Sequence, residues 1–205
     1  MSEPNPPEQA AGQAVRAEAL EHLLVDKGIL TSTEVDNYIE TWTNRIGPMV
    51  GASVVARAWV DPAFTERLLV DATTAVGEIG INPGRLERLE VVVNGPGVHN
   101  VVCCTLCSCY PWTLLGLPPS WYKSPEYRSR IVREPRQVLA EMGLELDQDV
   151  TINVWDSSAE VRYLVIPERP SGTDGLSEEQ LAAIVTRDSM IGVATVAAPA
   201  GTGST

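Results

Sequence analysis

The sequence predicts an α+β protein, in which a helical N-terminal arm precedes a compact domain with a small β-sheet and a cysteine metal loop. Apolar residues recur at helical spacing over the first 80 positions, and short β-rich runs begin at residue 89. All four cysteines fall within residues 103–109, which we call the cysteine loop. A chain of 205 residues is long enough to bury one well-packed core.

Composition divides the chain into four expected parts. A start rich in Pro, Glu, Gln and Ala predicts a disordered lead-in, and small polar residues at the end predict a flexible tail. The parts are the lead-in (1–14), the helical arm (15–80), the domain that carries the cysteine loop (81–193) and the tail (194–205).

The arm is expected to contain three amphipathic helices, over residues 15–28, 31–47 and 61–78. Thr31 and Glu34 have the spacing of a capping box, and Asp61 followed by Pro62 is a favourable helix start. Little in the sequence provides a surface for these helices to pack against. The arm is therefore expected to be an interaction surface for a partner subunit.

The following domain mixes short strands with helices. β-branched runs predict strands at 89–93, 100–103, 150–155 and 161–166. Three helices are also predicted. Ser124 followed by Pro125 indicates one at 125–132, Pro135 one at 135–142, and the capping box that begins at Ser177 one at 177–185. This alternation predicts a compact α+β domain around the cysteine loop.

Charge and cysteine usage limit the classes of function. The balance of 15 basic against 27 acidic residues gives a net charge of −12, which argues against nucleic acid or an anionic membrane as a partner. No secretory signal is visible, and no apolar run approaches the roughly 20 residues that span a bilayer. A cytoplasmic, reducing setting is expected, in which clustered cysteines are metal ligands or redox groups rather than disulfides.

The cysteine loop combines a Cys-x-x-Cys with a Cys-x-Cys over Cys104, Cys107 and Cys109. Two sulfurs one residue apart can chelate one ion only if the backbone folds tightly around it. The amide nitrogens of Ser108 and Cys109 then come within bonding distance of a strongly Lewis-acidic trivalent ion. Three sulfurs and two nitrogens fill five positions of an octahedron and leave the sixth open, which is typical of a catalytic site.

Three other uses of the cysteines stay open at this point. A structural zinc site would use all four, although zinc motifs usually place two cysteine pairs on separate knuckles. The ligands of an iron–sulfur cluster are usually spread more widely, and a redox Cys-x-x-Cys would leave Cys109 without a role. Cys103 is expected to be a small buried hydrophobe at the end of a strand rather than a ligand.

The run 104–112 resembles the metal-binding claw of the α-subunit of cobalt-type nitrile hydratases. In that family Thr at the position of Thr105 accompanies cobalt, whereas Ser accompanies iron. The sequence departs from the family pattern where Asn100 follows His99 in place of a second histidine. Flanking stretches match as well, at 116–119, 121–123, 127–130, 154–158, 169–175 and 187–192.

The resemblance implies a role for each site residue. Cys104, Cys107 and Cys109, with the backbone nitrogens of Ser108 and Cys109, would ligate one low-spin Co(III). Cys107 would become a sulfinate and Cys109 a sulfenate, both steps on the cysteine oxidation ladder. Ser108 would offer its hydroxyl near the open position. The other implied positions are a wall of the substrate pocket and a supporting network below the loop, namely Trp112, Asp156, Ser157 and Arg162.

The activity that the resemblance implies is hydration of an organic nitrile to its amide, with Cys109 and Ser108 as catalytic residues. The attacking oxygen is either that of the Cys109 sulfenate or that of an activated water. The resemblance also implies a β-subunit, with which the chain forms an αβ or α2β2 assembly and without which it is inactive. It further implies an activator protein that delivers cobalt. A thiocyanate hydrolase subunit and a non-enzymatic zinc module are the alternatives.

Overall fold

The structure is a computed structural model that describes residues 6–44, 47–81, 88–107 and 109–199. By packing, the chain divides into two compact units, Met1–Arg45 and Ile46–Thr205. The expected boundary between arm and domain lay at residue 80. Residues 46–80 thus group with the second unit, because their helices contribute to its core.

The first unit contains α1 (Pro6–Asp26) and α2 (Ser32–Asn44). α1 begins at Pro6 instead of Val15, so residues 6–14, expected to be disordered, are helical; Glu, Gln and Ala are good helix formers, and Pro suits a first turn. The capping box before α2 is confirmed, since Glu34 accepts a hydrogen bond from the Thr31 amide at 2.7 Å and the Glu34 amide donates to Thr31 Oγ1 at 3.2 Å.

The second unit opens with α3 (Pro48–Val60), α4 (Pro62–Val70) and α5 (Ala72–Glu78). The sequence did not predict α3, because the helix is apolar on most of its surface and lacks a clear amphipathic period. The single helix expected over residues 61–78 is two helices. Asp71 separates them and caps α5 by accepting a hydrogen bond from the Thr74 amide at 3.0 Å.

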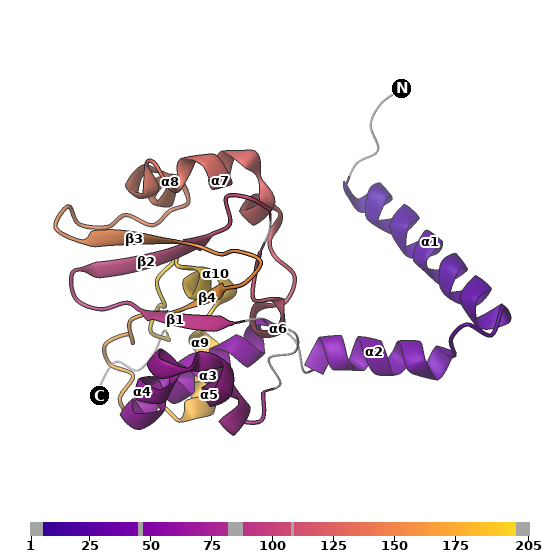
Figure 1. Cartoon of the computed structure of the whole chain (residues 1–205), viewed down its shortest axis with the longest axis horizontal. Coiled ribbons are helices and arrows are strands. Elements are labelled where there is room, and N and C mark those ends of the chain that lie inside the picture. Colours follow the sequence, from indigo (N-terminus) through magenta and orange to yellow (C-terminus); the bar gives the residue numbers. More distant parts are fainter. Residues whose placement is uncertain (1–5, 45–46, 82–87, 108, 200–205) are drawn as a thin grey trace. The chain divides into compact units, whose positions relative to one another are not determined.

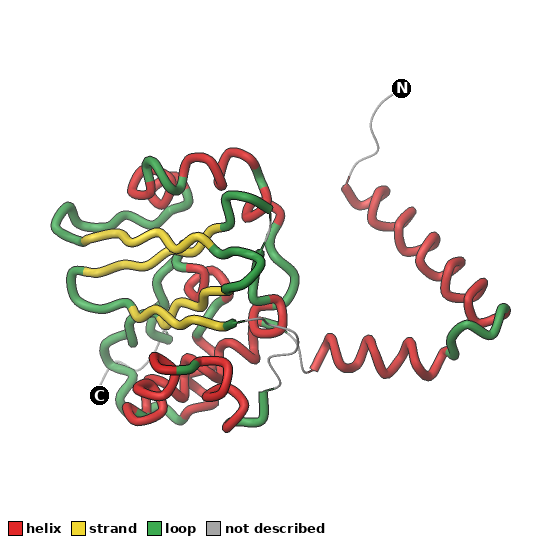
Figure 2. The backbone as a smooth tube through the Cα atoms, viewed as in Figure 1, coloured by secondary structure: helices red, strands yellow, loops and turns green. Residues whose placement is uncertain are grey.

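Two pairs of parallel strands form the centre of this unit (Figures 1 and 2). β1 (Leu89–Val93) pairs with β4 (Arg162–Ile166), and β2 (Val98–Cys103) pairs with β3 (Thr151–Asp156). All four lie close to the expected strands. The expected small sheet is thus present as two two-stranded parallel sheets.

Helices cover both sides of these strands. Figure 1 shows α8 (Pro135–Glu141) beside β3, with α7 (Pro125–Arg130) packed against α8. On the other side, α4 and α5 lie beside β1, and α3 packs against α4. The predicted caps at Ser124 and Ser177 are confirmed by side-chain hydrogen bonds to the first turns of their helices. The remaining elements are α6 (Trp112–Leu115), a short 3-10 helix (Ser120–Lys123), α9 (Glu178–Ile184) and α10 (Arg187–Ile191).

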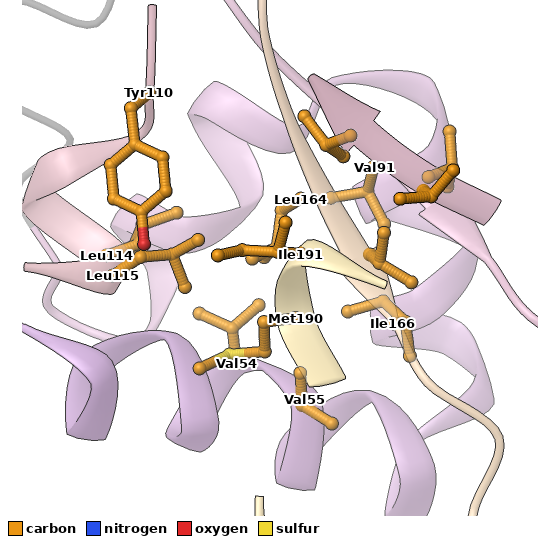
Figure 3. Packing of buried hydrophobic residues seen from close by; sticks show 14 of the residues in the cluster. Val54, Val55, Val91, Tyr110, Leu114, Leu115, Leu164, Ile166, Met190 and Ile191 are labelled. Carbon is orange, nitrogen blue, oxygen red and sulfur yellow. The ribbon is translucent and has the colours of Figure 1, made fainter. Parts of the chain in front are cut away.

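The core joins α3, α6 and α10 to the strands (Figure 3). α3 carries Gly51 where it meets α6 and α10, because an added Cβ would lie 2.8 Å from both the Leu114 carbonyl oxygen and the Met190 sulfur. Side chains from each element interdigitate there, among them Val54, Leu114, Leu115, Leu164, Met190 and Ile191. This packing fixes α6, which directly follows the cysteine loop. Within the part of the chain that the structure describes, no helix is long and apolar enough to cross a membrane.

Candidate metal centre

The cysteine loop lies where two parallel strands end together. β2 ends at Cys103 and β3 ends at Asp156, and these two residues are paired in register. Because parallel strands carry their carboxyl ends to the same edge, the loop that follows β2 and the side chain of Asp156 meet there. The sheet register thus brings together groups separated by about fifty residues in sequence.

Three sulfur atoms converge within the loop. The Sγ atoms of Cys104, Cys107 and Cys109 all lie within 4.8 Å of one another. Those of Cys104 and Cys107 are 3.5 Å apart, and those of Cys107 and Cys109 are 3.1 Å apart. The prediction for Ser108 falls outside the described residues. A set of three close thiols fits the donor requirements of a thiophilic metal ion, which would bind them as thiolates.

Burial of the three sulfurs is graded. Cys104 is fully buried and Cys109 nearly so, whereas Cys107 is exposed. Burial and the bond to the Cys107 sulfur raise the pKa of the Cys109 thiol to about 12, and the positive charge of Arg162 acts in the opposite direction. Without a cation the Cys109 thiol therefore holds its proton near neutral pH, and a bound metal ion would have to displace that proton.

Cys103 stands apart from the other three cysteines. Its side chain is fully buried in the hydrophobic core, and it does not belong to the group of sulfurs that converge in the loop. Burial, followed by the nearby Asp156 carboxylate, raises the pKa of its thiol to about 12. The expectation that Cys103 is a small buried hydrophobe agrees with this environment.

Asp156 holds Thr105 by two hydrogen bonds. Its carboxylate accepts one from the Thr105 amide at 2.8 Å and one from the Thr105 hydroxyl at 2.5 Å. A carboxylate with two donors on one residue fixes both the backbone and the side-chain rotamer of that residue. Asp156 therefore supports the loop directly through Thr105.

Ser157, Arg162 and Trp112 lie around the same edge. The Ser157 amide donates to the Cys103 carbonyl at 2.8 Å, and the Ser157 side chain is buried. The Arg162 guanidinium donates to the Ser158 carbonyl and bears electrostatically on Cys109. Trp112 opens α6 with 39% of its side chain exposed. The structure thus places all three near the loop.

The sequence analysis did not predict the residues that donate hydrogen bonds to the backbone carbonyls in and just before the cysteine loop. Tyr127 donates its hydroxyl to the Val102 carbonyl at 2.7 Å, and Arg128 donates to the carbonyls of Cys104 and Thr105. Tyr122 donates to the Cys109 carbonyl at 2.9 Å. The available signal was the run of residues 121–128, where three aromatic and two basic residues follow the cysteine loop.

Burial raises the pKa values of Tyr122 and Tyr127, which therefore stay protonated as hydrogen-bond donors. Their rings pack with that of Trp121, whose centroid lies 4.9 Å from that of Tyr127. The aromatic cluster thus forms a rigid wall that presents hydroxyl donors to the loop.

The three thiols lie at a sheet edge, in a loop held by an acidic residue, a basic residue and two buried tyrosines. They form the candidate metal site of a protein of mixed α and β structure. Residues 11–194 match the family model described as "Nitrile hydratase, alpha chain". The chain belongs to this family, whose enzymes are hydro-lyases.

Individual relatives agree with this family. The chain is 55% identical over 186 residues to the low-molecular weight cobalt-containing nitrile hydratase subunit alpha of Rhodococcus rhodochrous, covering 91% of this chain and 90% of that one. A solved structure of a double-histidine variant of the Fe-type nitrile hydratase of Comamonas testosteroni superposes with a TM-score of 0.82 at 41% identity, covering 93% and 96%. The gamma subunit of thiocyanate hydrolase from Thiobacillus thioparus is 44% identical over 187 residues, covering 86% and 76%.

Proposed function

We propose that this chain is the α-subunit of a cobalt nitrile hydratase, which adds water to organic nitriles and forms amides. The observation that carries the proposal is the convergence of the Cys104, Cys107 and Cys109 sulfurs within 4.8 Å, in a loop whose Thr105 is held by Asp156. The 55% identity to a cobalt-containing α-subunit supports cobalt over iron.

The proposed metal ligands are the three sulfurs and the backbone nitrogens of Ser108 and Cys109, which would hold one low-spin Co(III). Bound cobalt supplies Lewis acidity that polarises the nitrile carbon–nitrogen bond. Cys107, the exposed sulfur, is proposed to become a sulfinate and Cys109 a sulfenate. Ser108 would offer a hydroxyl beside the substrate, and Ser108 and Cys109 are the proposed catalytic residues.

Residues around the loop have proposed roles that match their positions. Trp112 is half-exposed beside the loop and would line the pocket for the organic part of the nitrile. Asp156 would keep the loop in shape through Thr105. Ser157 and Arg162 would support the loop from behind, and the Arg162 charge would favour an anionic sulfur at Cys109.

A β-subunit is the proposed partner, in an αβ or α2β2 assembly. Leu106 within the cysteine loop and Leu117 after α6 are 83% and 68% exposed, and apolar groups so exposed are usually covered by a partner. In the separate N-terminal unit, Val15, Leu20 and Tyr38 are each more than half exposed, which supports a role for this arm in subunit interaction.

Oxidised sulfurs are anions and require cationic neighbours, which two β-subunit arginines would supply. The isolated chain should accordingly be inactive. An activator protein is proposed to deliver the cobalt. A cytoplasmic location is proposed because all four cysteines are free thiols, which a reducing compartment maintains.

The test is amide formation from aliphatic and aromatic nitriles by the chain co-produced with its β partner in cobalt-supplemented cells. Cys104→Ala, Cys107→Ala and Cys109→Ala should each abolish activity. Cys103→Ala is the matched control, because Cys103 is buried outside the sulfur cluster, and it should retain activity. Full activity of the Cys107→Ala or Cys109→Ala variant would rule out the proposed centre.

Thiocyanate hydrolysis is the second candidate, favoured by the 44% identity to the thiocyanate hydrolase subunit. A site for this small anion would be expected to present a cation at the position of the half-exposed Trp112 indole. The same preparation should therefore convert nitriles much faster than thiocyanate. The reverse ratio would assign the chain to the thiocyanate enzymes.

A further inference from the structure

Arg128 reaches the cysteine loop from a distant part of the chain. It lies in α7, and its guanidinium donates from Nε to the Cys104 carbonyl at 3.1 Å and from Nη2 to the Thr105 carbonyl at 2.7 Å. One planar group thus holds two consecutive carbonyls of the loop. The contact is partly buried, so water competes with it less than at an exposed site.

We propose that Arg128 is a positioning residue that folds the cysteine loop into its metal-binding shape, an inference that rests on the proposed function of that loop. Its role is separate from that of Asp156, which holds the amide and hydroxyl donors of Thr105. Arg128 holds the acceptors. Thr105 is thereby fixed at both its donors and its acceptor by groups of opposite charge.

The geometry explains how this contact brings the sulfurs together. In an extended strand, consecutive carbonyls point to opposite sides, so two neighbours that share one guanidinium require a bent backbone. Residues 105–107 do form a bend. At the end of this bend, the Cys107 amide donates to the Cys104 sulfur at 3.3 Å, and the sulfurs of Cys104 and Cys107 approach to 3.5 Å. The bend that Arg128 holds at these two carbonyls is thus the same bend that brings the Cys104 and Cys107 sulfurs together.

Arginine suits this task better than lysine. A guanidinium presents several N–H donors in a rigid fork, whereas an ammonium is a compact point donor on a flexible stem. Lysine at this position could hold one carbonyl at a time and would leave the bend less constrained. A replacement that lacks the charge and the fork, such as glutamine, would leave both carbonyls with weaker partners.

The competing explanation is that Arg128 only stabilises the fold. Arg133 offers a matched control, because it follows the same helix and its Nε donates to the Ser129 carbonyl at 2.9 Å without touching the loop. A general loss of one arginine contact should affect Arg128→Gln and Arg133→Gln in the same way. Only a role in loop geometry should change the metal–sulfur readout of Arg128 variants alone.

The experiment titrates the full-length chain, purified metal-free and reduced with its β partner, with Cd(II). Thiolate–cadmium absorption in the ultraviolet reports binding. Arg128→Gln should bind Cd(II) about tenfold more weakly than the native chain and with an altered band, as expected when a group that orients ligands is lost. Arg128→Lys should be intermediate, and Arg133→Gln should match the native chain.

Native affinity and a native band in Arg128→Lys would overturn the proposal, as would equal effects of Arg128→Gln and Arg133→Gln. If Arg128→Gln is insoluble, Arg128→Lys decides the question alone. Because cadmium binding needs neither cobalt nor turnover, the outcome is separate from the test of nitrile hydration. A chain that hydrates no nitrile but shows weaker Cd(II) binding in Arg128→Gln would refute the proposed function and retain this inference.

Discussion

The carboxylate of Asp156 binds both hydrogen-bond donors of Thr105, the amide at 2.8 Å and the hydroxyl at 2.5 Å. This relationship follows from the strand register, which pairs Asp156 with Cys103 at the end of two parallel strands. The loop that carries the sulfurs therefore depends on the sheet for its shape. The first two predictions test this dependence.

Asp156→Asn should weaken metal binding. An amide offers one acceptor oxygen and would present an N–H group to a second donor, whereas the carboxylate accepts from both. A hydrogen bond to a charged group is worth about 1.5–3 kcal/mol, so the metal affinity should fall about tenfold or more. Metal titration of the full chain with its partner measures the effect. Glu160→Gln, a change at an exposed nearby acid, is the control. Unchanged affinity in Asp156→Asn would contradict this account.

Thr105 and Asp156 should also be energetically coupled. In a double-mutant cycle with Thr105→Val and Asp156→Asn, the two changes in unfolding free energy should not add, and the interaction energy should exceed about 0.5 kcal/mol. Thr105→Ser keeps the hydroxyl and should preserve most of the coupling. Urea unfolding of the four cycle members provides the measurement. Strict additivity would show that the bond between the Thr105 hydroxyl and the Asp156 carboxylate contributes nothing to stability.

Local patterns in the sequence predicted much of the fold. The β-branched runs at 89–93 and 161–166 match β1 and β4 closely, and the capping boxes at Thr31 and Ser177 are confirmed. The helix α3 was missed because a helix buried on most sides shows no amphipathic period. Because α3 is part of the core, the first unit ends at Arg45 and not at residue 80, where the sequence analysis placed the end of the arm.

In the site, too, contacts between residues close in sequence could be predicted, whereas contacts between distant residues could not. The three sulfurs converge as expected because Cys104, Cys107 and Cys109 are close in sequence, so a short bend suffices to join them. The contacts of Arg128 with the loop depend on how α7 is held against the end of β2, where Tyr127 donates to the Val102 carbonyl, and no short motif encodes that packing. The sequence did suggest Asp156, but only through resemblance to a family.

Gly192 should not tolerate a side chain. Its φ of 91° lies in the left-handed region, and an added Cβ would lie 2.0 Å from the Asn100 carbonyl oxygen. Gly143 has a similar φ of 93° but nothing within 4 Å of an added Cβ. Gly143→Ala should therefore lower the free energy of unfolding by about 1–2 kcal/mol. Gly192→Ala should lower it by considerably more, and equal losses in denaturant titrations would refute the steric argument.

His99 is held in its neutral form by its neighbours. Asn94 Oδ1 accepts from the Asn100 amide at 2.8 Å, so its Nδ2 faces His99 Nδ1 at 3.2 Å as a donor. His99 Nε2 lies 2.7 Å from the Gly192 carbonyl, which can only accept, so Nε2 carries the proton. Burial lowers the pKa of His99, and this effect is larger than that of the hydrogen bond to the Gly192 carbonyl, which raises it.

The stability of the chain should accordingly fall in mild acid. Below the ordinary histidine pKa of 6.5 the unfolded chain takes up a proton that the folded chain does not, so the free energy of unfolding decreases as the pH falls from there through the lowered pKa. Urea midpoints between about pH 7.5 and pH 5 should show this slope. The slope should be smaller in His99→Gln and unchanged in His22→Asn, which alters the other histidine of the chain. Equal slopes in all three proteins would exclude His99 as the cause.

Cys104, Cys107 and Cys109 are proposed to hold a catalytic cobalt ion. Elemental analysis and intact mass of the chain, purified with its β partner from cobalt-fed cells, are the decisive test of this proposal. We expect one cobalt per chain, with added oxygen located on Cys107 and Cys109 by peptide mapping. Stoichiometric zinc with four unoxidised cysteines would contradict it and would indicate a structural zinc site instead.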